Sequence, residues 1–115
     1  MAVNTIDMKV FTELQAAAGA DFVKELVETF LEEVPVMLET LRTALAAGDT
    51  NGFRRTAHSL KTNGLTFGAV ALGAQARELE LTGLEQLGAG AAAAIDRLQQ
   101  SCEQAAVDLR ELCHE

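Results

Sequence analysis

The chain has 115 residues, of which 49% are hydrophobic, and its 17 acidic and 9 basic residues give a net charge of −8. This length suits one domain with one core, so we expect a single domain over residues 1–115. The acidity argues against nucleic acid or an anionic membrane as a partner, because such surfaces are bound by dense lysine and arginine.

The composition favours an all-α protein. Alanine, leucine and glutamate are abundant, proline occurs once, and runs of β-branched or aromatic residues are missing. No apolar stretch approaches the roughly 20 residues needed to cross a bilayer, and the first residues lack the basic head and apolar body of a signal peptide. We therefore expect a cytoplasmic protein.

The first two helices are predicted over residues 6–18 and 22–47. Thr5 is the expected N-cap of the first helix, Asp21 of the second, and Gly19 and Gly48 are the expected ends. Apolar residues at gaps of four and three predict one buried stripe on the second helix: Phe22, Leu26, Phe30, Val34, Met37, Leu41 and Leu45.

Pro35 lies inside this second helix. It removes one backbone hydrogen bond, and because the apolar spacing continues past it we expect a kink in one helix. Two separate helices are the alternative.

Three further helices are predicted over residues 50–67, 69–81 and 89–112. Asp49 is the expected cap of the third helix, Gly68 forms the turn into the fourth, and a loop near Thr82 and Gly83 precedes the fifth. The predicted buried stripes are Phe53, Ala57, Leu60, Gly64 and Phe67, then Leu72, Ala76 and Leu79, then Ala91, Ile95, Leu98, Cys102, Ala105, Leu109 and Leu112.

These patterns predict an antiparallel four-helix bundle with up-down-up-down topology and left-handed packing. The four-three alternation in the last helix has a period near 3.5 residues, which favours the shallow crossing of such bundles. The first helix is then an additional short N-terminal helix across one end. Cys102 and Cys113 are 11 residues apart on one helix, about 16 Å, so we expect buried thiols and no disulfide between them.

A basic region surrounds the only histidine in the middle of the chain, His58. No acidic residue lies between Thr50 and Arg77, whereas four basic residues do: Arg54, Arg55, Lys61 and Arg77. His58 is on the flank of the buried stripe, so we expect its ring to be accessible to solvent. Four cations around one imidazole suit an anion such as a phosphate. The plain alternative is a surface histidine beside solvated surface charges.

The hairpin around Gly68 suggests a partner for the ring. The two helices must run antiparallel, so residues ten to twelve positions after the turn should lie opposite His58. Of these, Glu80 is on the flank of its helix and is the expected acceptor of a hydrogen bond from one ring nitrogen, which would leave the other nitrogen free to attack. Glu78 is the second choice. An ion pair between a glutamate here and Arg77 or Lys61 is the structural alternative.

At this point the chain resembles the histidine-containing phosphotransfer domains of multistep two-component signalling. The family's signature places a lysine three residues and a glycine ten residues after the histidine, as Lys61 and Gly68 follow His58, and Leu60 and Ala69 are common flanking choices. The sequence Thr66-Phe67-Gly68 is similar to the phosphotransfer domain of chemotaxis kinases. Family members also carry glutamine or glutamate 22 residues after the histidine, which is the position of Glu80.

The resemblance implies a phosphoryl carrier without turnover of its own. His58 would take the phosphoryl group from a receiver-domain aspartate or a kinase and pass it to another receiver aspartate, with Lys61 and Glu80 assisting. The implied partners are the receiver domain of a response regulator and a sensor or hybrid histidine kinase. We expect no cofactor or metal bound by this domain, Mg²⁺ on the receiver, and a monomer.

Further residues are candidates for support or docking. The supporting set is Arg54, Arg55, Thr62, Gly64, Leu65 and Gly68, and Val70, Ile6 and Met8 are additional apolar docking candidates unless they are core. Thr62 stands where the family usually has glycine, so it either crowds the site or contributes a hydroxyl.

Two other functions compete with the carrier. Thr62 is compatible with an inert binding or scaffold bundle that no longer carries phosphate. The segment Glu111-Leu112-Cys113-His114 contains the Glu-x-x-His spacing used in di-iron bundles, although a second such pair is missing.

Overall fold

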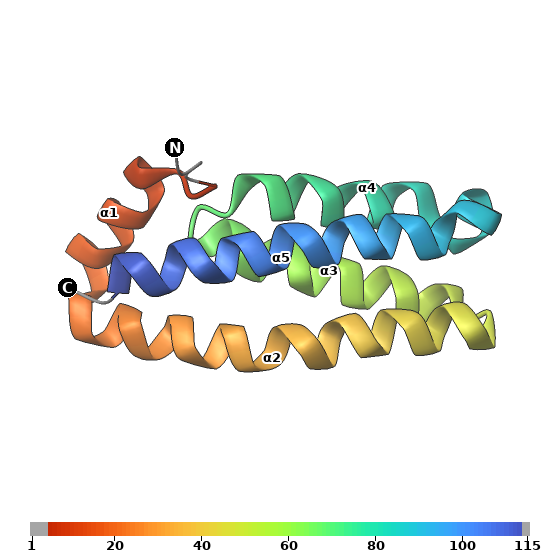
Figure 1. Cartoon of the computed structure of the whole chain (residues 1–115), viewed down its shortest axis with the longest axis horizontal. Helices are drawn as coiled ribbons and strands as arrows, with labels where there is room; N and C mark the ends of the chain where they lie inside the picture. The colour runs from red at the N-terminus through yellow and green to blue at the C-terminus, as the bar shows by residue number, and fades with distance from the viewer. Residues whose placement is uncertain (1–4, 114–115) are drawn as a thin grey trace.

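The computed structural model describes residues 5–113. Four long helices lie side by side along the length of the molecule, and a shorter helix crosses one end (Figure 1). They are α2 (Ala20–Ala47), α3 (Thr50–Thr66), α4 (Val70–Leu87) and α5 (Ala91–Cys113), with α1 (Met8–Ala18) across the end and a 3-10 turn, η1 (Gly88–Gly90), before α5. Both α2 and α4 pack against α3 and α5. The predicted all-α four-helix bundle with a short N-terminal helix is confirmed.

None of the helices within residues 5–113 is long and apolar enough to span a membrane.

The start of α1 differs from the prediction. The helix begins at Met8, and its N-cap is Asp7 rather than Thr5. Asp7 Oδ1 accepts a hydrogen bond from the Lys9 amide at 3.0 Å and from the Val10 amide at 3.5 Å. A carboxylate suits this position because it pairs with the free amides of the first turn and with the positive end of the helix dipole.

Helices α1 and α2 meet at Gly19, whose φ of 93° permits the sharp change of direction. The predicted Asp21 cap is wrong, because α2 begins at Ala20 and no side chain caps it. Asp21 lies instead in the first turn. The helix continues through Pro35, as predicted, and ends at Gly48 in the left-handed conformation.

The buried face of α2 is rotated from the predicted stripe. Phe30, Val34 and Leu41 are buried as expected, but Phe22 is 53% exposed. The helix also buries four residues that were not predicted, Val23, Val27, Leu38 and Ala44, while Leu26, Met37 and Leu45 are partly buried. The buried residues still recur at gaps of three and four, so they form one stripe whose rotation about the helix axis differs from the prediction at both ends.

The buried stripes of α3, α4 and α5 match the prediction, except that Leu112 is only partly buried. Asp49 caps α3 by accepting a hydrogen bond from the Gly52 amide at 2.9 Å, as expected. The boundaries differ more for α4, which extends to Leu87 but is broken at Gly83, where φ is 78° and ψ is 159°. The predicted loop is therefore a break inside α4, and α5 begins at Ala91.

Both cysteines are free. Cys102 is buried, and burial raises the pKa of its thiol to about 12. Cys113 is only partly buried, so the expectation of two buried thiols holds for Cys102 alone.

Gly68 joins α3 to α4 in a conformation that other residues adopt at a cost. Its φ is 82°, and an added Cβ would lie 2.7 Å from the Asp7 carbonyl oxygen. We expect Gly68→Ala to lower the free energy of unfolding by about 2 kcal/mol or more, because backbone strain adds to the close contact. Gly90→Ala is the matched control, since nothing lies within 4 Å of its Cβ position. Urea denaturation measures both; equal losses in the two variants would contradict the expectation.

Candidate functional site

The candidate site lies on the hairpin of α3 and α4. Two close approaches fix its register: a Cβ on Gly64 would lie 2.5 Å from Leu72 Cδ2, and one on Gly73 would collide with the Leu65 side chain. Gly64 is thus a packing residue that lets the helices approach. Gly68 closes the turn, with its amide bonded to the Leu65 carbonyl at 3.0 Å. The two helices of the hairpin are therefore closely packed next to the turn.

His58 and Glu80 face each other across this hairpin. His58 Nδ1 is 2.7 Å from Glu80 Oε2, and the His58 side chain is 56% exposed while that of Glu80 is 18% exposed. This is the contact expected from counting residues around Gly68. Glu78, the second choice, is exposed on the same helix.

Lys61 completes a cluster of three charged or titratable groups. Its Nζ is 2.8 Å from Glu80 Oε1, so the two oxygens of one carboxylate face the ammonium and the imidazole. The hydrogen bond from Lys61 is the largest of the effects that lower the pKa of Glu80; burial opposes it, and His58 adds to it. The carboxyl is thus ionised at neutral pH and cannot donate. His58 Nδ1 must then carry the hydrogen, which directs the lone pair of a neutral ring to Nε2.

The lowered pKa of Glu80 gives a testable titration. We expect carboxyl NMR to give a pKa for Glu80 below the ordinary range of glutamate, and Lys61→Met to raise it, because the lysine is the main cause. The stabilisation from this pair is complete above the ordinary pKa of glutamate and is lost as the pH falls through the lowered value. A Glu80 pKa that Lys61→Met leaves unchanged would contradict this assignment.

The other polar candidates lie around the cluster but do not join it. Arg54 and Thr62 are exposed on α3. Arg55 is exposed as well, and its Nε donates to the Asn51 carbonyl at 3.4 Å. The Thr62 carbonyl accepts a hydrogen bond from the Thr66 hydroxyl at 3.0 Å. The cations therefore form a surface near His58 rather than contacts with it.

Three exposed apolar residues lie on the elements that meet near the turn between α3 and α4. Leu65 is 44% exposed, Val70 50% and Met8 40%, which makes them available to a partner. Ile6 is not available: it is 4% exposed and pairs as an isolated bridge with Ala69. Of the two possibilities for Ile6, docking and core, the structure shows the core.

Three contributors to this region were not found from the sequence: Asp7, Gly73 and Asp108. Asp7 caps α1, Gly73 makes room for Leu65, and Asp108 is a buried carboxylate on α5. An aspartate shortly before an amphipathic segment was a readable signal for Asp7. Nothing in the local sequence distinguishes Asp108 from a surface residue.

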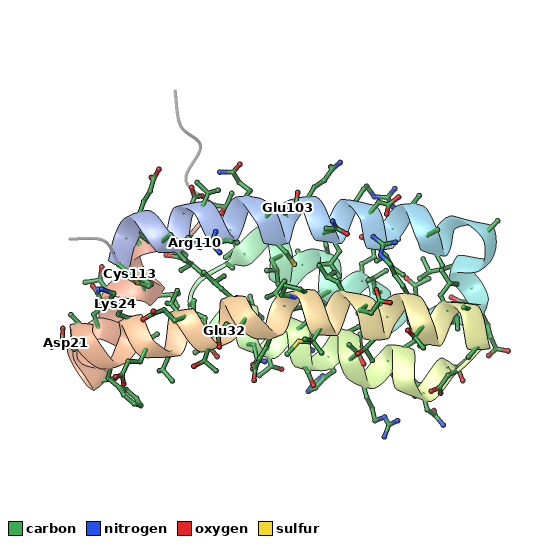
Figure 2. The ribbon with its side chains drawn as sticks, turned by 60° about the horizontal axis from the view of Figure 1, so that its bottom comes forward. Asp21, Lys24, Glu32, Glu103, Arg110 and Cys113 are labelled. Carbon is green, nitrogen blue, oxygen red and sulfur yellow. The ribbon has the colours of Figure 1, made fainter. Side chains whose placement is uncertain are left out.

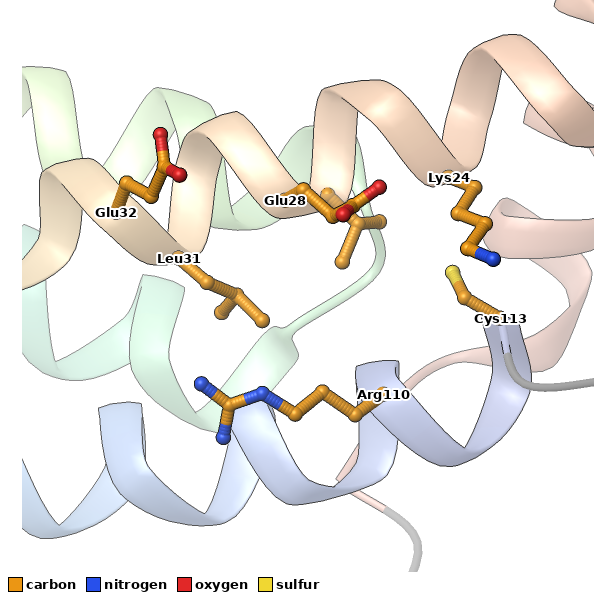
Figure 3. A pocket seen from close by; sticks show the side chains of 7 residues that line it. Lys24, Glu28, Leu31, Glu32, Arg110 and Cys113 are labelled. Atoms are coloured by element: carbon orange, nitrogen blue, oxygen red, sulfur yellow. The ribbon is translucent and has the colours of Figure 1, made fainter.

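Two clefts lie elsewhere, between α2 and α5 (Figure 2). One, of about 560 Å³, contains Cys102. The other, of about 410 Å³, is lined by Lys24, Val27, Glu28, Leu31, Glu32, Arg110 and Cys113 (Figure 3). No lining residue of either cleft comes from α3 or α4, so the clefts are separate from His58.

The metal-binding alternative gains no support. No group of three or more histidine, cysteine or acidic side chains in residues 5–113 is arranged to hold a metal ion. His114 lies outside the described residues.

Comparisons with known proteins identify the architecture. A family model described as "Hpt domain" matches residues 25–108. The crystal structure of histidine-containing phosphotransfer protein B from Pseudomonas aeruginosa PAO1 is similar over 96% of this chain and 95% of that one, with a TM-score of 0.88 and 28% identity. No curated protein sequence matches.

The matched range contains the whole cluster of His58, Lys61 and Glu80. It covers well over half of the chain, and the structural likeness extends to nearly all of it. The chain therefore belongs to the Hpt domain family, whose role is to carry phosphoryl groups in phosphorelay signalling.

Proposed function

We propose that His58 is the phosphorylated residue of this carrier and that Nε2 is its nucleophile. The observation that supports this most is the 2.7 Å contact between His58 Nδ1 and the ionised Glu80 carboxylate. In the neutral ring it holds the hydrogen on Nδ1 and so places the lone pair on Nε2, and the ring is more than half exposed.

Transfer proceeds by in-line displacement at phosphorus. The Nε2 lone pair forms the new N–P bond while the bond from phosphorus to the aspartyl oxygen of the donor breaks, and that oxygen leaves as a carboxylate. Nδ1 keeps its hydrogen throughout, so the ring becomes positively charged as the N–P bond forms. Glu80 stabilises this charge through the existing hydrogen bond. Transfer to the next aspartate is the reverse reaction, and the carrier is regenerated without turnover of its own.

Lys61 supplies positive charge beside the attached phosphoryl group. Its ammonium is already held near the ring through Glu80, and phosphoryl transfer is catalysed mainly by positioning and by cations. Arg54 and Arg55 add to the basic surface and favour approach of an acidic partner. We propose that Mg²⁺ arrives with the receiver domain rather than with this chain.

The proposed partners are a response-regulator receiver domain and a sensor or hybrid histidine kinase. Members of the Hpt family interact with both classes, which supports this choice. We propose that the chain acts in the cytoplasm as a monomer, because a carrier must present the same histidine face to successive partners.

One residue favours a second function. Thr62 occupies the position at which glycine is usual and is exposed one turn after His58. If its side chain blocks transfer, the bundle is a phosphate-inactive binding or scaffold module.

Intact-mass measurement separates these functions. The protein is incubated with phosphoramidate, and the carrier is expected to gain one phosphoryl group that is lost in acid. A receiver domain with Mg²⁺ is then added, and the phosphoryl group is expected to move to the receiver aspartate. A folded protein that gains no phosphoryl group would favour the scaffold. Thr62→Gly tests the cause: restored loading in this variant would assign the block to the threonine.

A further inference from the structure

A buried carboxylate on α5 holds the start of the chain. Asp108 is 7% exposed, and it is the one charged residue classed as buried among residues 5–113. Its Oδ2 accepts hydrogen bonds from the Thr5 amide at 2.7 Å and the Thr5 hydroxyl at 2.8 Å, while Gln104 donates to Oδ1 at 3.3 Å. A buried charge is retained only where such partners compensate its lost hydration. Asp108 therefore depends on Thr5, and Thr5 is fixed by Asp108.

The segment Thr5–Asp7, here called the strap, connects α5 to the turn between α3 and α4. After Thr5, Ile6 is 4% exposed and forms an antiparallel bridge with Ala69. The Asp7 amide then donates to the Gly68 carbonyl at 2.8 Å, and the Asp7 side chain caps α1. Every residue of the strap thus has a specific contact with the bundle or with α1.

The strap determines where α1 begins. Met8 directly follows the strap and is 40% exposed. The strap residue Ile6 forms its bridge with Ala69, and the next residue, Val70 at the start of α4, is 50% exposed. Leu65 lies just before the same turn, seven residues and about 10 Å along α3 from His58. Three elements therefore bring exposed apolar residues to the turn between α3 and α4, and α1 is the element joined to this turn through the strap.

We propose that Asp108 is a positioning residue for partner docking. By anchoring the strap it fixes α1 against the turn between α3 and α4, and so completes the surface of Met8, Leu65 and Val70 on which a receiver domain docks. This inference rests on the proposed function. It assigns an effect on docking to a residue on α5, a helix that does not carry the reacting groups.

Asp108→Ala is expected to separate docking from chemistry. Loading of His58 from phosphoramidate should stay within about twofold of the wild type, because a small donor needs only the Nε2 face. With a receiver domain that accepts phosphate from the wild-type protein as the probe, the apparent KM should rise roughly three- to tenfold while the rate at saturation changes little. By NMR, the Asp7 amide should exchange its hydrogen about tenfold faster or more.

The controls use neighbouring groups of matched chemistry. Asp96→Ala removes an exposed carboxylate from the same helix, where it pairs with Arg42, and should change neither the KM nor the Asp7 exchange. Thr5→Ser keeps both donors to Asp108 and should behave as the wild type. Thr5→Val removes the hydroxyl donor and keeps the amide donor, so the KM and the Asp7 exchange should rise by a smaller factor. If Asp108→Ala does not fold, Thr5→Val is the variant that tests the proposal.

The outcomes are distinguishable. An unchanged KM in a folded Asp108→Ala or Thr5→Val variant overturns the inference, as does unchanged exchange at Asp7, while the proposed function stands. A wild-type protein that neither loads phosphate nor passes it to any receiver overturns the proposed function instead, and the inference with it.

Discussion

Replacing His58 with glutamine is expected to abolish phosphorylation of this protein. Glutamine keeps a polar side chain on α3 but has no nitrogen lone pair that can attack phosphorus. In the phosphoramidate reaction, the wild-type protein should gain one acid-labile phosphoryl group by intact mass, and the variant should gain none. Because 56% of the His58 side chain is exposed, the free energy of unfolding should change by no more than about 1 kcal/mol.

The stability measurement makes the loss interpretable. Thermal or urea unfolding must give nearly equal values for the wild type and His58→Gln, so that the missing adduct reflects chemistry and not misfolding. Ser59→Ala is a matched control, since Ser59 is also exposed and adjacent in sequence, and it should load normally. An adduct of the same size and acid lability on His58→Gln would remove His58 from the mechanism.

Replacing Glu80 with alanine should give the second largest effect, a slower reaction with the fold retained. The variant loses the acceptor for His58 Nδ1 and the partner of Lys61. A hydrogen bond to a charged group is stronger than one between neutral groups, so its loss from the transition state should lower the rate roughly tenfold or more. Pre-steady-state loading of His58 measures this rate.

Glu80→Gln separates the hydrogen bond from the charge. Glutamine retains an acceptor oxygen for Nδ1 but does not balance the charge of Lys61 or of the developing imidazolium. Its rate should therefore lie between those of the wild type and Glu80→Ala. Equal rates in all three proteins would show that Glu80 takes no part in transfer.

The sequence alone predicted the bundle and the contact of His58 with Glu80 because both depend on local regularities. In α3 and α5 the apolar residues recur at fixed gaps, and Gly68 fixes the point from which two antiparallel helices are counted. The contact of His58 with Glu80 then follows from counting residues in both directions from Gly68. The sequence also suggested Lys61 as a possible partner of a glutamate in this region. It did not predict that Lys61 and the His58 ring both contact the Glu80 carboxylate.

The sequence predicted α2 less well because several positions of its stripe offer two adjacent apolar residues, such as Phe22 and Val23. The four-three rule picks one stripe, which placed Phe22 in the core although it is 53% exposed, and missed Val23. Which of two adjacent apolar residues is buried depends on the rotation of the helix, and that rotation is decided by its partners. The spacing of apolar residues along the chain does not determine this rotation.

The strap could not be predicted because its contacts are tertiary. Thr5 is a reasonable N-cap by residue type, yet its hydroxyl and amide bond to Asp108, 103 positions away. Asp7, and not Thr5, is therefore the N-cap of α1. Local capping preferences cannot rank two candidates when one of them has a partner so distant in sequence.

The position of the phosphoryl group within the protein tests the central proposal most directly. The protein is loaded with phosphoramidate, and fragmentation mass spectrometry locates the modified residue while phosphorus NMR identifies the modified ring nitrogen. We expect a single phosphohistidine at His58, attached through Nε2, because Glu80 holds the hydrogen on Nδ1. Attachment through Nδ1, or on any residue other than His58, would contradict the proposed site.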